Sequence, residues 1–162
     1  MPNDTMLLLE NQLCFPLYAC AKEVVRHYKP FLDKLDLTYT QYIVMMVMWE
    51  KKQLTFKALG ELLRLDSGTL TPVMKKLVAK HFLTRERSTE DERVVTLTLT
   101  EEGERLKQKA LEVPPQMRQC IRLDAEEMAV LRKILNRLIH GFDELDASGQ
   151  WTASGMDAGK EN

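Results

Sequence analysis

The residues in this sequence best suited to redox chemistry are its three cysteines, Cys14, Cys20 and Cys120. A thiolate attacks peroxides to give a sulfenic acid, which condenses with a second thiol to form a disulfide. Cys14 is the strongest candidate, because Pro16 is tolerated only in the first turn of a helix and so places Cys14 close to a helix start. Unpaired N–H groups there favour negative charge. The alternative is that Cys14 is a small buried hydrophobe, as free cysteines most often are.

Cys20 is expected to serve packing. Six residues on a helix correspond to about 600°, so Cys20 and Cys14 point to different faces. The three histidines, His27, His81 and His140, are scattered, and no Cys/His pair has the spacing of zinc ligands. We therefore expect no metal and no cofactor.

The composition predicts one soluble domain and leaves no room for a large two-domain enzyme: the 162 residues are 44% hydrophobic and 29% charged. The net charge is −1, so any basic surface depends on uneven distribution. Three cysteines are too few for a secreted fold held by disulfides. The N-terminus lacks the features of a signal peptide, and the most apolar stretch, 42–49, is shorter than the roughly 20 residues that span a bilayer. We expect a cytoplasmic protein without a membrane partner.

Most of the chain has helical periodicity. A first amphipathic helix is predicted within residues 8–28. Thr38 and Gln41 fit a capping box, and the helix that follows is apolar nearly all round, which indicates burial on most sides.

Two short helices then predict a helix-turn-helix. The first covers residues 56–63, and the connection over 64–68 leads directly into the second. Taken alone, Pro72 favours Thr71 as the N-cap and would shorten the second helix.

After His81 the period changes to two, as in strands. Residues 82–87 and 93–99 alternate, and the second run is rich in β-branched residues. The polar residues 88–92 between them indicate a turn. A β-hairpin directly after a helix-turn-helix is typical of a winged helix.

Two more helices are predicted towards the C-terminus. Thr100 caps the first, whose opening turn is acidic, and Pro114 and Pro115 interrupt it. Asp124 caps a long helix to about Leu145. The apolar stripe of this long helix consists of Met128, Leu131, Ile134, Leu135, Leu138 and Phe142.

The predicted fold is therefore mostly α with a small β-wing: a winged helix-turn-helix with N- and C-terminal dimerisation helices. Residues 38–100 form the DNA-binding domain, and residues 8–37 with 101–145 form the helical dimerisation region. Residues 146–162 are small and polar, which predicts a disordered tail. The long apolar stripes need a partner, and a second copy in a symmetric homodimer is the simplest one.

A local basic segment indicates double-stranded DNA as the partner. Between Arg64 and Arg87 there are six Lys or Arg and two acidic residues, a net +4. Arg93 lies at the hairpin tip, where the Asp91 carboxylate could hold its guanidinium extended for insertion into the minor groove. The other predicted DNA-binding residues are Ser67, Thr69, Thr71, Lys75, Lys76, Arg85 and Arg87. A solvated charged face, or a winged helix that binds protein, remains the alternative.

Several motifs carry a resemblance to a known family. The run LLRLDSGTLTP over 62–72, the wing residues TRERS and EDER, and LTLTEEG over 97–103 resemble the MarR family of dimeric winged-helix repressors. The segments LENQLCF over 9–15 and LTYTQY over 37–42 resemble the organic-hydroperoxide-sensing repressors of the OhrR type.

This resemblance implies that the recognition helix starts near Ser67, which overrules the interpretation based on Pro72 alone. It further implies that the hydroxyls of Tyr28 and Tyr39 donate to the Cys14 thiolate. Two-cysteine members carry a resolving cysteine on the other subunit, which here corresponds to Cys120.

The function implied is a repressor that binds a pseudo-palindromic operator as a homodimer. An organic hydroperoxide, the inducer, would oxidise Cys14 to a sulfenate, and an intersubunit disulfide with Cys120 would release the DNA. One alternative is a MarR-type repressor relieved by non-covalent binding of a phenolic or lipophilic ligand. A thiol peroxidase is a third possibility, but the sequence shows neither a catalytic base at a recognisable spacing nor a CxxC motif.

Overall fold

The computed structural model describes residues 4–89, 91 and 93–149, which fall into two compact units; the boundary along the chain lies between Cys120 and Ile121. The described chain is mostly helical, with one small sheet, as predicted. The α-helices of the first unit are α1 (Cys14–Leu32), α2 (Tyr39–Lys51), α3 (Phe56–Leu63), α4 (Ser67–Ala79), α5 (Glu101–Ala110) and α6 (Val113–Cys120). Its 3₁₀ helices are η1 (Asp4–Leu7), η2 (Leu9–Asn11) and η3 (Asp33–Leu35). The second unit consists of α7 (Ala125–Ser148) in its described part.

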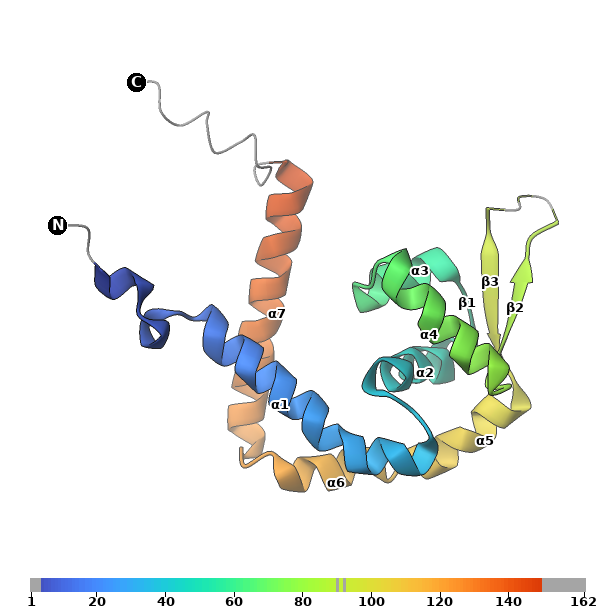
Figure 1. The fold of residues 1–162 in the computed structure, drawn as a ribbon, viewed down its shortest axis with the longest axis horizontal. Coiled ribbons are helices and arrows are strands. Elements are labelled where there is room, and N and C mark those ends of the chain that lie inside the picture. The colour runs from blue at the N-terminus through green and yellow to red at the C-terminus, as the bar shows by residue number, and fades with distance from the viewer. Residues whose placement is uncertain (1–3, 90, 92, 150–162) are drawn as a thin grey trace. The chain divides into compact units, whose positions relative to one another are not determined.

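The sheet has three antiparallel strands in the order β1–β3–β2. The predicted hairpin is present as β2 (Leu83–Arg87) and β3 (Val95–Leu99), and Figure 1 shows it rising beside the C-terminal end of α4. The sequence did not predict β1 (Gln53–Thr55), which pairs with the other edge of β3. Three residues are too few to show an alternating pattern.

Helix α2 forms the centre of the first unit. The predicted capping box is confirmed: the Gln41 backbone N–H donates to the Thr38 hydroxyl at 3.3 Å, and the Thr38 N–H donates to Gln41 Oε1 at 2.9 Å. Val44, Met45 and Met48 are fully buried. These side chains pack in one core with those of α3, α4 and the hairpin, so the position of the winged helix depends on α2.

The recognition helix α4 begins at Ser67, and the N-cap at Thr71 favoured by Pro72 alone is wrong. Asp66 is the cap, and its carboxylate accepts a hydrogen bond from the Thr69 N–H at 2.8 Å. A proline inside a helix removes one backbone hydrogen bond. Here this cost is outweighed by the cap and by the burial of the three core side chains of the helix, Leu70, Met74 and Leu77.

Several helix ends differ from the expected ones. Helix α1 begins at Cys14 as predicted but continues to Leu32. Helix α5 ends at Ala110, and the two prolines lie in the first turn of a new helix, α6, where proline is tolerated. Helix α7 has the predicted Asp124 cap and continues to Ser148, three residues into the expected tail. Residues 150–162 of that tail lie outside the described residues.

Among the helices that the structure describes, none combines the length and the apolar content needed to cross a bilayer.

Residue 103 in α5 must be a glycine, because Phe82 and Leu99 lie too close to its backbone to leave room for a side chain. This gives a first prediction. A Cβ at this position would lie 2.7 Å from Leu99 Cδ1 and still closer to the Phe82 carbonyl oxygen. The Gly103 carbonyl also accepts a buried hydrogen bond from the Trp49 indole at 2.8 Å. We expect Gly103→Ala to lower the free energy of unfolding by about 1–3 kcal/mol, measured by urea denaturation, because the crowded site must shift. Lys109→Ala, at an exposed position of the same helix, is the control and should change stability by no more than about 0.5 kcal/mol; equal stability of both variants contradicts the prediction.

Candidate functional site

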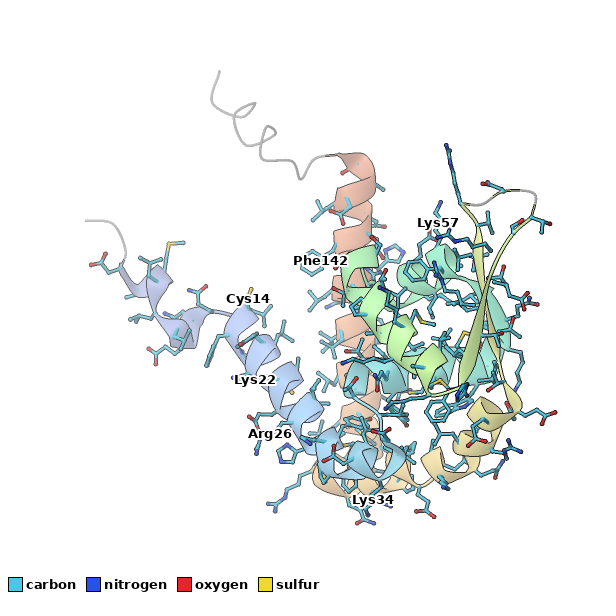
Figure 2. The ribbon with its side chains drawn as sticks, turned by 45° about the vertical axis from the view of Figure 1, so that its right-hand side comes forward. Cys14, Lys22, Arg26, Lys34, Lys57 and Phe142 are labelled. Atoms are coloured by element: carbon cyan, nitrogen blue, oxygen red, sulfur yellow. The ribbon has the colours of Figure 1, made fainter. Side chains whose placement is uncertain are left out.

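Cys14 is the first residue of α1, and its side chain is exposed (Figure 2). Its backbone N–H is one of those that have no intrahelical partner. Within one chain Cys14 is therefore not a buried hydrophobe. Cys20 and Cys120 are also exposed and free, so Cys20, which was expected to serve packing, is not buried within the chain either.

The two tyrosines predicted to donate to Cys14 lie together, but far from Cys14 of the same chain. The rings of Tyr28 and Tyr39 are in contact, with centroids 5.1 Å apart. Cys14 and Tyr28 both lie on the continuous helix α1, and their spacing corresponds to about 21 Å along its axis. A hydrogen bond from Tyr28 to Cys14 within one chain is therefore impossible.

A third tyrosine, Tyr42, joins this pair. Its ring lies 5.9 Å from that of Tyr28 and 6.2 Å from that of Trp49. Burial, and secondarily the neighbouring Tyr39, raises the pKa of Tyr28, and burial likewise raises the pKa of Tyr42. Both phenols therefore keep their protons at neutral pH and can act as hydrogen-bond donors. The sequence did not predict Tyr42 as a member of this cluster, although its spacing of three from Tyr39 places both on one helix face.

Cys120 is the last residue of α6, which packs against α1 in the first unit (Figure 1). Its sulfur lies 3.7 Å from the Gln116 carbonyl oxygen, as expected for a thiol that donates to the preceding helical turn. No disulfide links it to Cys14 or Cys20, all of which the structure describes.

The exposed face of α4 carries the side chains predicted to contact DNA: Ser67, Thr69, Thr71, Lys75 and Lys76. One of them also has a structural role, since the Thr69 hydroxyl donates to Asp66 Oδ2 at 2.9 Å as part of the N-cap. Hydrogen bonds from Thr69 hold the pKa of Asp66 below its usual value, so the cap stays ionised at neutral pH. At pH values above the ordinary aspartate pKa, the ionised cap stabilises the folded protein. This stabilisation is lost as the pH falls through the lowered pKa of Asp66.

The basic segment is smaller than its sequence suggests. Lys80, at the end of α4, forms an ion pair with Asp36 at 2.8 Å and also binds the Asp36 carbonyl oxygen. This lysine ties the recognition helix to the turn after α1. The other basic side chains that this segment exposes on α4 and β2 are Lys75, Lys76, Arg85 and Arg87.

The wing carries Arg85 and Arg87, both exposed on β2, and Arg93 near its tip. Asp91 supports this tip differently from the prediction. Its carboxylate accepts a hydrogen bond from the backbone N–H of Arg93 at 2.9 Å, so the contact found fixes the turn and not the guanidinium.

Comparison with known proteins places this geometry in a family. The family described as "Transcriptional regulator SarA/Rot" matches residues 26–110. The chain is 47% identical over 131 residues to the organic hydroperoxide resistance transcriptional regulator of Bacillus subtilis. The match covers 81% of this chain and 89% of the relative.

Two solved structures of AbfR, a protein of Staphylococcus epidermidis, are also similar. Reduced AbfR bound to DNA has 30% identity and a TM-score of 0.76, and the match covers 90% of this chain and 99% of AbfR. Disulfide-formed AbfR has 31% identity and a TM-score of 0.60, with 84% and 96% covered. The chain therefore belongs to the SarA/Rot family of transcriptional regulators, which share the MarR-like winged helix.

Proposed function

We propose that this chain is a homodimeric repressor that binds a pseudo-palindromic DNA operator when reduced and releases it when an organic hydroperoxide oxidises Cys14. The observation that carries the proposal is the exposed thiol at the first residue of α1. Support comes from the relative named for organic hydroperoxide resistance and from a related protein solved both reduced on DNA and with a disulfide.

The uncovered apolar faces of the helices support the homodimer. Helix α7 has no buried residue and exposes Val130, Leu131, Ile134, Ile139, Phe142 and Leu145. The start of α1 exposes Phe15, Leu17 and Tyr18. A second copy would cover such faces, because a water-soluble protein rarely leaves so much apolar surface exposed.

The dimer also supplies the hydroxyl donors that one chain cannot. Because Tyr28 and Cys14 are separated by most of the length of α1, the thiolate of one copy must meet Tyr28 and Tyr39 of the other. Both phenols lie in one cluster and so can converge on a single sulfur. Each reactive centre then contains residues of both subunits.

The oxidation takes place in two balanced steps. The Cys14 thiolate attacks the outer oxygen of the hydroperoxide; the O–O bond breaks, an S–O bond forms, and the organic group leaves as an alcohol after taking up a proton. The resulting sulfenic acid then condenses with the Cys120 thiol of the second copy, which forms the disulfide and releases water. The peroxide supplies both oxidising equivalents.

The disulfide would act on DNA binding through geometry. It requires Cα atoms within about 7 Å, so α1 of one copy and α6 of the other must move together. Two recognition helices fit major grooves about 34 Å apart, one helical turn of DNA. A disulfide that changes the spacing of the two α4 helices therefore weakens binding to the operator.

Non-reducing gel electrophoresis after treatment with cumene hydroperoxide tests this scheme. We expect the wild type to form a covalent dimer that disappears with Cys14→Ser and with Cys120→Ser. Cys20→Ser is the matched control and should still form the dimer. A covalent dimer that survives loss of Cys120 but disappears with Cys20 would assign the resolving role to Cys20 and contradict the pairing.

A further inference from the structure

Cys14, Ala21 and Tyr28 lie in one line along helix α1. Each is seven residues from the next, which corresponds to about 700°, or about 20° short of two full turns. The three side chains therefore share one face of the helix, and Ala21 lies about 10 Å along the axis from each of the other two. Figure 2 shows Cys14 at the start of this helix and Lys22, the neighbour of Ala21, further along it.

This face of α1 is open to solvent within one chain. Ala21 is exposed, and so are its apolar and aromatic neighbours on the same face, Leu17, Tyr18 and Val25. Glu23 is about 200° around the helix from Ala21, so its charge lies on the opposite side. The line from Cys14 to Tyr28 is therefore a face that can pack against another apolar helix face.

The symmetry of the proposed homodimer determines how two such helices meet. In the proposed function the Cys14 thiolate of each copy meets Tyr28 of the other, so the same contact occurs at both ends of the helix pair. Because α1 is one continuous helix from Cys14 to Tyr28, both contacts form only if the two helices run antiparallel, side by side. The two-fold axis then passes the residue midway between 14 and 28, so Ala21 of one copy faces Ala21 of the other.

The antiparallel arrangement links the spacing at Ala21 to the spacing at the thiols. Two antiparallel axes are as far apart at Ala21 as at the two ends where Cys14 and Tyr28 meet. Packed helices lie about 8–10 Å apart, and the distance depends on the side chains at the contact. A methyl group at residue 21 allows the short end of this range, whereas a larger side chain would separate both thiol sites at once.

We propose that Ala21 lies where the α1 helices of the two copies meet, and that its small side chain sets the spacing at which Tyr28 of one copy reaches the Cys14 thiolate of the other. The inference rests on the proposed function, because that function pairs these two residues. Ala21 touches neither the oxidant nor the thiol, so it acts as a positioning residue.

Disulfide crosslinking tests the meeting point. In the full-length protein with all three native cysteines replaced by serine, Ala21→Cys should form a covalent dimer on treatment with copper phenanthroline, because the two Cα atoms would lie within about 7 Å. Glu23→Cys in the same background is the matched control, since Glu23 is equally exposed on α1 but lies on its opposite side. It should not crosslink.

A larger side chain tests the spacing. The measurement is the rate constant for loss of the Cys14 thiol with cumene hydroperoxide and with hydrogen peroxide. We expect Ala21→Leu to remain a dimer and to react about tenfold more slowly with both oxidants, because hydrogen bonds from the phenols stabilise the thiolate. In a protein that also carries Tyr28→Phe and Tyr39→Phe, the same substitution should slow the reaction by less than about twofold, since no hydroxyl donor remains. Glu23→Leu is the control and should leave both rates unchanged.

Several results would overturn the proposal. Absence of a crosslink through Ala21→Cys would do so, and so would equal crosslinking through Glu23→Cys. Dissociation of Ala21→Leu into monomers, or equal slowing with and without the two phenols, would show that Ala21 maintains the dimer or the fold and not the spacing. Failure of the proposed function is distinguishable, because it would appear as release of Cys14→Ser from the operator by peroxide, whatever the crosslinking result.

Discussion

Cys14→Ser is expected to bind the operator as the wild type does and to be insensitive to cumene hydroperoxide. The wild-type protein should lose about 100-fold in operator affinity on oxidation, near the upper end of typical coupling between two sites. Serine has almost the size of cysteine, but its hydroxyl forms neither a sulfenic acid nor a disulfide. The affinity of Cys14→Ser for an operator fragment, measured by fluorescence anisotropy with and without peroxide, should change by less than about twofold.

Two controls accompany this measurement. Cys20→Ser should respond to peroxide as the wild type does. Cumyl alcohol, which has the shape of the oxidant but no O–O bond, should not release the DNA. Release of Cys14→Ser by the peroxide, or of the wild type by the alcohol, would instead support a repressor relieved by non-covalent binding of a ligand.

Arg93→Ala is expected to cause the second large effect, a loss of about 10- to 100-fold in operator affinity for the reduced protein. Arg93 lies exposed near the tip of the wing, and in the proposed function its guanidinium enters the minor groove. Salt titrations of the same complex should show a slope reduced by about one, because one cationic contact is lost.

Lys34→Ala is the matched control for charge, because Lys34 is exposed on η3 at the end of the first unit away from the wing (Figure 2). It should leave the operator affinity unchanged. Equal affinities of Arg93→Ala and the wild type would remove the wing tip from the DNA interface.

Substitutions of Asp91 separate its two possible roles. Asp91→Asn keeps an acceptor for the backbone N–H of Arg93 and should bind nearly as the wild type does, whereas Asp91→Ala loses this bond and should bind more weakly. An equal loss in both variants would favour the carboxylate–guanidinium contact predicted from the sequence.

Much of the winged helix could be predicted because its signals are local. The change of period after His81 predicted the hairpin, and the Thr38 and Asp124 caps fixed the starts of α2 and α7. One local rule taken alone failed. Pro72 favoured a late start of α4, but the Asp66 cap and the buried face of the helix determine the start, which the family resemblance placed correctly near Ser67.

The candidate site was less predictable because it depends on distances that a sequence does not contain. The sequence indicated Cys14, Tyr28 and Tyr39 as one site, but within one chain Cys14 and Tyr28 lie about 21 Å apart along α1. The engagement of Thr69 by Asp66 and of Lys80 by Asp36 also depends on geometry. These contacts give both side chains structural partners that composition alone does not reveal.

The central claim is that oxidation of Cys14 itself lowers operator affinity. A titration of the protein–operator complex with cumene hydroperoxide tests it most directly when the bound fraction and the mass of the Cys14 peptide are measured in the same samples. We expect the loss of bound DNA to follow the fraction of oxidised Cys14 at every point. Complete release while Cys14 remains a thiol, or full binding once Cys14 is oxidised, would contradict the account.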